Sequence, residues 1–370
     1  MADYNKLVIK KIVVFGGTGA QGSPIVRALS ASPQNFQITI PTRNLNSAPA
    51  IELSKLPNVS LLLANYQTET GLRAIFAGQD ACYFNLNSFT LLESQEYFLT
   101  FRAYEIAVQS GLKWFVLSGS PDRYAMHGYQ EKYRNSHGVV SGRLSSWLEN
   151  QPLSVLPWTV LHGGVYAQML SSLLAPALIE PDGNEGEGVY EFAAPIGSAG
   201  TIPFVDVDDY GVRTRYVLEH PEECVGKTIG WAPWYTTYPE LVKAFESVTG
   251  KRALLRDCSQ NEWFERLKAY VDPETSLPIG SDRMDGERKE EGKMMGTFTF
   301  RESFGAWWNL WRDYDKIRDL DSEAEVERWS DMVAPGRARS LEEWMRRSGY
   351  TGKFAEVQKA KIEENRAKLT

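Results

Sequence analysis

Short apolar runs alternate with amphipathic stretches through the first 165 residues of the chain. An apolar run of four to eight residues bounded by turn residues is typical of a buried parallel strand, whereas apolar residues at helical spacing indicate a helix. Alternating strands and helices predict an α/β fold with a doubly wound parallel sheet, whose ligands lie at the carboxyl ends of the strands. We predict strands at residues 12–15, 36–44, 59–66, 80–89, 113–120 and 157–166, and helices at 21–29, 69–78 and 93–110.

The pattern becomes less regular after residue 165, which predicts a domain over residues 1–165 and a smaller α+β lobe over residues 166–353. Within that lobe, residues 202–220 are expected to form a strand and a helix that return to the main sheet, the helix being capped by Asp206 or Asp208. We also expect a mobile charged insertion at residues 280–296 and a charged helical tail at residues 354–370.

Three glycines at intervals of three follow the first predicted strand, in the segment KIVVFGGTGAQGSPIVRALS. Glycines here allow a tight turn and a close approach to a pyrophosphate, while the start of the next helix supplies free N–H groups. A purely structural turn is the alternative, but the position between strand and helix favours nucleotide binding. The predicted pyrophosphate contacts are Gly16, Thr18, Gly19, Ala20, Gln21 and Gly22.

Arg43 ends the second predicted strand, where an NAD-binding protein commonly has an acid for the ribose 2′-hydroxyl. No carboxylate is close in the sequence, and a guanidinium matches a 2′-phosphate by bidentate hydrogen bonding. We therefore favour NADP(H) over NAD(H), with a solvated surface arginine as the alternative. Further cofactor contacts are expected at Asn44 and, along the carboxyl edge of the sheet, at Asn65, Tyr66, Asn85, Leu86, Asn87 and Ser118, although such residues also serve as ordinary turn or cap residues.

The net charge and composition of the chain limit the classes of partner that we expect it to bind. The net charge of −7 argues against a nucleic-acid footprint and favours a small-molecule partner. There is no signal-peptide pattern and no apolar run long enough for a membrane span. The three cysteines and four histidines are scattered without zinc spacing, so we expect a reducing, cytoplasmic environment and no metal site.

The combined motifs resemble the NmrA-like family, an atypical branch of the short-chain dehydrogenases/reductases. The resemblance covers almost the full length and rests on GGTGAQG, Arg43, YFNLNSF, KYRNSHG, PWTVLHGGVYAQML, IPFVDVDDYG and SLEEWMRRSGY, the last being similar to fungal members. It implies a Rossmann domain that binds NADP(H), with the smaller lobe covering the nicotinamide and the substrate. Family members range from non-catalytic NADP-sensing regulators to reductases and ring-forming enzymes of natural-product pathways, so the resemblance does not fix the function.

The usual acid–base pair of short-chain reductases is missing. These enzymes commonly use Tyr-x-x-x-Lys to protonate the product alkoxide, and no tyrosine in this chain has a lysine four residues later. Many related proteins carry a segment similar to His-Tyr-Asp-x-Lys-Gly-Arg-Val, which here begins at His137 with Val139 in place of the acid and Ser141 in place of the lysine. The catalytic candidates that remain are Glu131, Lys132, Tyr133, Tyr166 and Ser118, and each is also compatible with a structural role.

Two functions are compatible with these residues. One is a tailoring enzyme of fungal alkaloid-like metabolism that exchanges hydride with a C=N or iminium centre, which needs no strong acid because the product amine is neutral. Such an enzyme would act on a hydrophobic, aromatic or nitrogen-heterocyclic substrate, by net reduction or by redox-neutral ring formation. The alternative is a regulator that binds NADP(H) and a protein partner and has lost its chemistry. The sequence does not predict an oligomeric state.

Overall fold

The computed structural model describes residues 7–181, 188–268, 271–277, 298–314 and 320–355. The predicted insertion at 280–296 and most of the predicted tail at 354–370 lie outside these residues. A seven-stranded sheet is the main element, with strand order β11-β6-β5-β4-β1-β2-β3 and parallel pairing throughout. Its strands are β1 (Lys11–Val14), β2 (Gln37–Thr42), β3 (Val59–Leu63), β4 (Ala81–Phe84), β5 (Trp114–Gly119), β6 (Trp158–His162) and β11 (Thr228–Ile229).

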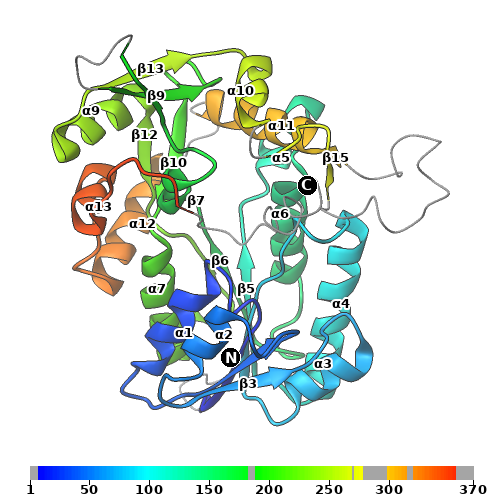
Figure 1. Ribbon diagram of the computed structural model, residues 1–370. Helices are drawn as coiled ribbons and strands as arrows, with labels where there is room; N and C mark the ends of the chain where they lie inside the picture. Colours follow the sequence, from blue (N-terminus) through cyan, green and yellow to red (C-terminus); the bar gives the residue numbers. More distant parts are fainter. Residues whose placement is uncertain (1–6, 182–187, 269–270, 278–297, 315–319, 356–370) are drawn as a thin grey trace.

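Helices cover both faces of this sheet, as the alternating pattern predicted (Figure 1). Side chains of successive strand residues point to opposite faces. In β1, Ile12 and Val14 belong to the buried cluster under α1 and α7, whereas Val13 packs with α3, α4 and α6. The fold is therefore the doubly wound Rossmann type. The helices are α1 (Gly22–Ser30), α2 (Ala48–Leu53), α3 (Glu69–Phe76), α4 (Glu93–Gln109), α5 (Arg123–Met126), α6 (Ser136–Glu149) and α7 (Val207–Glu219), with the 3₁₀ turn η2 (Glu131–Tyr133) between α5 and α6.

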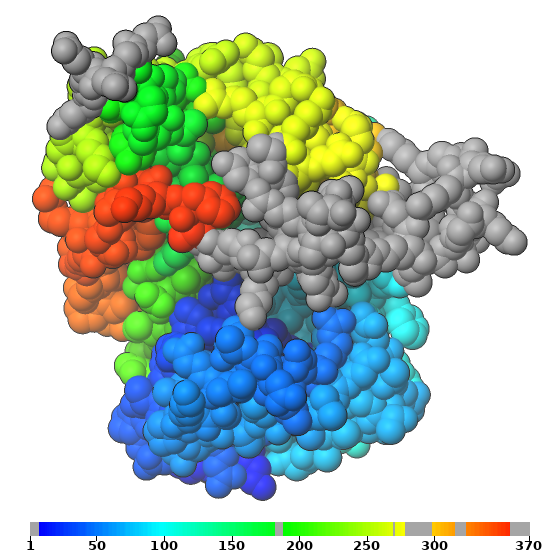
Figure 2. All heavy atoms as spheres, viewed as in Figure 1, coloured from blue at the N-terminus to red at the C-terminus, as the bar shows by residue number. Residues whose placement is uncertain are grey.

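Most of the remaining elements form a second region around its own aromatic-rich core, whereas the helices α8 and α12 pack against the core of the main sheet. Its strands form three small sheets, in the orders β12-β10-β7, β13-β9-β8 and β14-β15. The space-filling view shows the separation, with blue and light-blue atoms of the first elements below and green and yellow atoms of β9, β13 and α10 above (Figure 2). These elements are β7 (Val165–Tyr166), η3 (Ala167–Ser171), β8 (Ala177–Ile179), β9 (Val189–Ala194), β10 (Thr201–Val205), α8 (Pro221–Cys224), β12 (Trp234–Thr237), α9 (Tyr238–Thr249), β13 (Ala253–Asp257), α10 (Gln260–Leu267), β14 (Ser276–Leu277), β15 (Phe298–Thr299), α11 (Phe300–Arg312), α12 (Leu320–Val333) and α13 (Leu341–Ser348).

Local sequence signals define the ends of the helices in the second region. Helices α9, α10 and α11 each begin with a capping box, in which a Ser or Thr hydroxyl and a Glu three residues later satisfy the first backbone N–H groups. Helices α9 and α13 end at Gly250 and Gly349, whose φ angles of +69° and +65° lie in the left-handed region.

Three predicted segments differ from the structure in their boundaries or pairing. The strands predicted at 59–66 and 80–89 end at Leu63 and Phe84, because the following residues form turns. The strand predicted at 157–166 is divided into β6 and β7 at Gly163, where an added Cβ would lie 1.4 Å from the Tyr210 hydroxyl.

Residues 202–220, expected to return to the main sheet, do so only in their helical part. Strand β10 pairs with β7 and β12 instead of joining the seven strands. Helix α7 packs beside α1, and at Gly211 an added Cβ would lie 2.5 Å from the Pro24 carbonyl oxygen. The Asp206 side chain caps this helix by accepting from the Asp208 backbone N–H at 3.2 Å.

Candidate functional site

The glycine turn connects β1 to α1 at the carboxyl edge of the main sheet. Gly16 has a φ of +67°, and an added Cβ there would lie 3.2 Å from the Asn85 carbonyl oxygen. At Gly22 an added Cβ would lie 2.1 Å from the Gly16 carbonyl oxygen, so the turn can close only without a side chain at that position. Gly16 and Gly19 are exposed, which leaves this backbone open to a ligand.

The start of α1 is suited to an anion. Its N-cap residue, Gln21, provides no side-chain cap, and the first turn contains no acidic residue. Backbone N–H groups at a helix start and the helix dipole favour negative charge. The Ser23 N–H is already bonded to the Gly19 carbonyl at 3.0 Å, which fixes the shape of the turn.

The Gln21 side chain is buried and connects the glycine turn to three hydroxyl groups. Its Nε2 donates to the Tyr83 hydroxyl at 2.8 Å and to Ser118 Oγ at 3.1 Å. Its Oε1 accepts from the Tyr166 hydroxyl at 2.9 Å. We call Gln21, Tyr83, Ser118 and Tyr166 the glutamine hub. It brings together the start of α1 and the ends of β4, β5 and β7, so two sequence-predicted catalytic candidates, Ser118 and Tyr166, lie against a predicted cofactor residue.

The two phenols of the glutamine hub are weak acids. Desolvation raises the pKa of Tyr166 well above its ordinary value, and the charges of the nearby phenols of Tyr210 and Tyr83 reinforce that shift. Burial raises the pKa of Tyr83 in the same direction, and the Arg213 charge only partly opposes both shifts. These hydroxyl groups therefore keep their protons, and the Tyr166 hydroxyl donates to Gln21 while the Tyr83 hydroxyl accepts from it.

Arg43 immediately follows β2 and is exposed. It forms no ion pair with any residue that the structure describes. Burial raises the pKa of the Tyr66 phenol, and the Arg43 charge opposes that shift, which places the two side chains near each other at the ends of β2 and β3. The guanidinium is thus available to a ligand phosphate.

The asparagines along the edge mainly build turns. The Oδ1 atoms of Asn44, Asn65 and Asn87 each accept a backbone N–H two residues further on, at 2.9–3.1 Å. Asn85 differs, because its backbone and Nδ2 lie beside Gly16. Leu86 packs partly buried against the core under α3, α4 and α6. Of this predicted set, Asn85 is therefore in direct contact with the glycine turn.

The candidates Glu131, Lys132 and Tyr133 occupy η2 and face other partners. The Tyr133 hydroxyl donates to Asp313 Oδ2 at 2.5 Å, and Lys132 Nζ lies 3.3 Å from the same atom. The Glu131 carboxylate accepts from the Tyr124 hydroxyl at 2.6 Å. These contacts attach η2 to the residue after α11 and to α5, and none reaches the glutamine hub.

The segment from His137 to Ser141, which lacks the lysine of related proteins, forms the first turns of α6. Asn135 caps this helix by accepting from the Gly138 N–H at 2.9 Å, and Val139 is fully buried. Ser141 is half-buried, and its carbonyl accepts from the Ser145 hydroxyl. An added Cβ at Gly119 would lie 2.2 Å from Ser145 Oγ, so α6 approaches the end of β5 very closely.

Sequence reasoning missed Tyr83 and Arg213. Tyr83 lies in a fully buried strand and looked like core, and Arg213 lies in a helix where a surface position was the natural expectation. No local signal distinguishes either residue, because their neighbours come from distant parts of the chain.

The described residues also bear on two further kinds of feature, membrane spans and metal ligands. Within the described part of the chain, no helix is long and apolar enough to cross a membrane. The described residues include one group of potential metal ligands, His220, Glu222 and Glu223, whose ligand atoms lie within 4.8 Å of one another. This exposed group precedes β11 and so lies at the opposite edge of the sheet from the glycine turn.

Comparison with known proteins matches residues 9–282 to the NmrA-like family. The chain is 26% identical over 282 residues to the NmrA-like family domain-containing oxidoreductase hkm9 of Aspergillus hancockii, covering 74% of this chain and 83% of that protein. It superimposes on Nmra, a negative transcriptional regulator, with a TM-score of 0.66 at 18% identity, covering 97% and 98% of the two chains. The Citrobacter sp. triphenylmethane reductase complexed with NADP(H) gives a TM-score of 0.61 at 17% identity, covering 91% and 99%.

Proposed function

The chain belongs to the NmrA-like family, and from this we propose that it is an NADP(H)-dependent oxidoreductase acting on a C=N centre of a bulky nitrogen heterocycle. The reaction is either net reduction or redox-neutral ring formation. The observation that carries this proposal is the glutamine hub, which combines a nucleotide-type glycine turn with hydroxyl donors but no strong acid. The oxidoreductase name of the Aspergillus hancockii relative supports the same class.

The glycine turn fits a dinucleotide pyrophosphate. The tight turn that Gly22 allows, the exposed backbone at Gly16 and Gly19, and the acid-free first turn of α1 all suit a close-lying diphosphate. Arg43 would hold a ribose 2′-phosphate. When bound there, NADP(H) supplies or accepts the hydride at its nicotinamide ring.

The protonation chemistry of the glutamine hub favours an imine over a ketone. Reduction of a ketone leaves an alkoxide that needs a proton, and general acid catalysis typically contributes about 10²–10⁴-fold. Hydride addition to an iminium carbon gives a neutral amine and needs no such proton. Tyr166 and Ser118, held by Gln21, would orient the substrate by hydrogen bonding without having to ionise.

The test uses two substrates of nearly the same shape, 3,4-dihydroisoquinoline as the cyclic imine and 1-tetralone as the ketone. With NADPH deuterated at the transferred position, we expect deuterium at the imine carbon and little in the alcohol from the ketone. Rapid reduction of the ketone with no reduction of imines would contradict the proposal. For ring formation, we expect product to accumulate with a catalytic amount of cofactor and no net change in nicotinamide absorbance.

The variant Tyr166→Phe sharpens this test. If the step needs no strong acid, imine reduction should fall by less than about tenfold, well below the usual contribution of a general acid. Asn85→Ala serves as a comparison at the glycine turn, because it should weaken cofactor binding more than turnover of bound substrate.

A regulator is the second candidate, and the absence of an ionisable group at Val139 and Ser141 is the observation that favours it. Similarity in fold to Nmra, a negative transcriptional regulator, supports this alternative. A regulator would bind NADP(H) and a protein partner but transfer no deuterium to any imine or ketone. NADP-dependent capture of a defined partner, together with no hydride transfer, would replace the enzyme proposal.

A further inference from the structure

Within the described residues, several buried nitrogen atoms without hydrogen-bond partners belong to residues of α5, β6, α7 and α11. In native proteins nearly all buried polar groups have a partner, so a group of exceptions needs an explanation. The atoms of this group are Arg123 Nε, His162 Nε2, Arg213 Nε, Arg213 Nη2 and Trp311 Nε1, and other buried atoms without partners lie elsewhere in the described residues. We call Arg123, His162, Arg213 and Trp311 the arginine cluster.

Two pairs of contacts build the cluster, and His162 links them because the charges of both arginines act on its imidazole. Arg213 donates from Nη1 to the His162 carbonyl, and its Cζ lies 4.5 Å from the centre of the Tyr210 ring. The Arg123 Cζ lies 5.2 Å from the centre of the Trp311 ring and 5.8 Å from that of Tyr314. Burial, with the charges of Arg123 and Arg213, lowers the pKa of His162 to about 3, so the imidazole is neutral and the positive charge lies on the guanidinium groups.

The arginine cluster lies beside the glutamine hub. His162 is the last residue of β6, and Arg123 begins the helix that follows β5, so both are at the carboxyl edge where doubly wound sheets bind ligands. The Arg213 charge acts on Tyr83 and on Tyr166, two members of the hub. A substrate placed against Tyr166 and Ser118 would therefore extend toward these donors.

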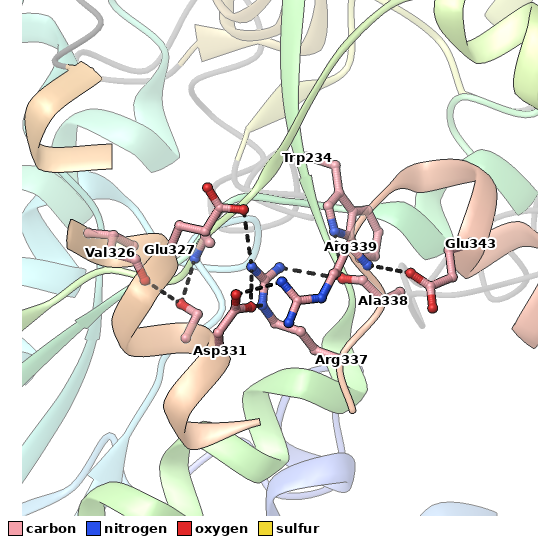
Figure 3. Close-up of polar contacts among 10 residues, drawn as sticks. Trp234, Val326, Glu327, Asp331, Arg337, Ala338, Arg339 and Glu343 are labelled. Atoms are coloured by element: carbon pink, nitrogen blue, oxygen red, sulfur yellow. Dashed lines mark hydrogen bonds and ion pairs between the residues drawn. The ribbon is translucent and has the colours of Figure 1, made fainter. Parts of the chain in front are cut away.

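Within the described residues, the positive charge of the cluster has no carboxylate in direct contact, and the charge of Asp209 acts on Arg213 only from a distance. Arg213 is fully buried, yet neither it nor Arg123 forms an ion pair within the described residues. Arg337, another buried arginine, differs because it lies 2.9 Å from the Asp331 carboxylate and 3.7 Å from Glu327 (Figure 3). A buried charge without a partner is strongly unfavourable, and an anionic ligand would relieve that cost.

We propose that Arg123 and Arg213 bind a carboxylate of the substrate, while the rings of Trp311 and Tyr314 contact its heterocycle. This inference rests on the proposed function and narrows its substrate class to heterocyclic acids. Two guanidinium groups repel a simple iminium cation, but a substrate that carries its own carboxylate is neutral overall and avoids that repulsion. Paired arginines also match the two oxygen atoms of a carboxylate by bidentate hydrogen bonding.

The test measures binding without turnover, in protein saturated with NADP⁺. Indole-3-acetate and the neutral indole-3-acetamide have nearly the same shape, and isothermal titration calorimetry gives both dissociation constants. We expect the acid to bind at least about tenfold more tightly, as a charged hydrogen bond of 1.5–3 kcal/mol implies. Equal affinities, or no binding of the acid, would overturn the inference.

Variants test whether the preference for the acid over the amide depends on the arginine cluster. Arg123→Gln should abolish the acid-over-amide ratio, and Arg123→Lys should retain only part of it because the charge remains but the planar fork is lost. Arg73→Gln, on the outer face of α3, should leave the ratio unchanged. A ratio that survives in Arg123→Gln protein with a native circular dichroism spectrum would also overturn the inference.

These outcomes are separate from those of the hydride-transfer test. Deuterium transfer to imines without a carboxylate preference would leave the proposed function standing and remove the carboxylate subsite. A carboxylate preference without deuterium transfer would leave the carboxylate subsite standing and remove the proposed function.

Discussion

The glycine turn and the arginine cluster lie at the same edge of the main sheet, but they are built in different ways. The turn uses the seven consecutive residues from Gly16 to Gly22 and offers backbone N–H groups, and its shape depends on the absence of side chains. The cluster takes four side chains from four elements, between residues 123 and 311, and offers charged donors. The first arrangement can bind any diphosphate, whereas the second can be altered one residue at a time to select a substrate.

This difference makes the glycine turn the less tolerant region. An alanine at Gly22 would place its Cβ 2.1 Å from the Gly16 carbonyl, so the backbone must move. We expect Gly22→Ala to destabilise the protein by about 3 kcal/mol and to weaken NADPH binding more than about 100-fold. Thermal unfolding and fluorescence titration measure both effects.

Gly336→Ala is the matched control, because nothing lies within 4 Å of an added Cβ there. Its stability and NADPH affinity should both stay close to those of the parent protein. A Gly22→Ala protein that binds NADPH normally would contradict the close approach of backbone and ligand.

A second buried ionisable group lies along the same edge of the sheet. It is the carboxyl group of Glu96 in the first turn of α4, whereas the arginine cluster holds cations. Burial raises the pKa of Glu96 to about 7, from an ordinary value of 4.5. The folded state therefore holds the proton more tightly, so this group stabilises the fold below pH 4.5 and that contribution is lost as the pH rises toward 7. Glu96→Gln keeps an acceptor for the Ser88 hydroxyl and removes the titration.

We expect Glu96→Gln to raise the free energy of unfolding by up to about 3 kcal/mol at pH 8 and to change it little at pH 4. Denaturant unfolding at both pH values measures this. Glu105→Gln, on the exposed side of α4, should change stability by less than about 0.5 kcal/mol at either pH. Equal effects of the two variants at pH 8 would show that Glu96 titrates normally.

The contacts of η2 allow a test with a smaller expected effect. Because Tyr133 is hydrogen-bonded to the residue after α11, its substitution should lower stability and leave the rate of hydride transfer largely unchanged. Tyr133→Phe removes the hydrogen bond to Asp313 and should cost about 1 kcal/mol, with NADPH affinity unchanged. Tyr129→Phe, on an exposed ring, should cost almost nothing. A loss of imine reduction beyond about 100-fold in Tyr133→Phe, with stability intact, would instead identify Tyr133 as a proton donor.

The sequence correctly predicts the features that depend on residues close together in the chain. The glycine turn, the alternation of parallel strands with helices and the cap by Asp206 or Asp208 all follow from local spacing, and the structure has the first two and places the cap at Asp206. The pairing of β10 with β7 and β12 depends on contacts between distant segments, so the expectation that it would join the main sheet was wrong.

The same distinction between nearby and distant residues in the chain applies to the partners of side chains. Ser118 and Tyr166 were selected because they end predicted strands, and they meet at Gln21. Asp313, the partner of Lys132 and Tyr133, is about 180 residues away, and the arginine cluster has no sequence motif, so no periodic pattern could have revealed either.

The central claim is that the edge formed by β1 and β2 binds NADP(H), with Arg43 at the 2′-phosphate. Fluorescence titration of the parent protein and of Arg43→Asp with NADPH and NADH tests it most directly. We expect the parent to prefer NADPH by about 10–100-fold and Arg43→Asp to lose that preference through weaker NADPH binding alone. Equal affinities of the parent for both cofactors would contradict the role of Arg43, and no binding of either would contradict the site itself.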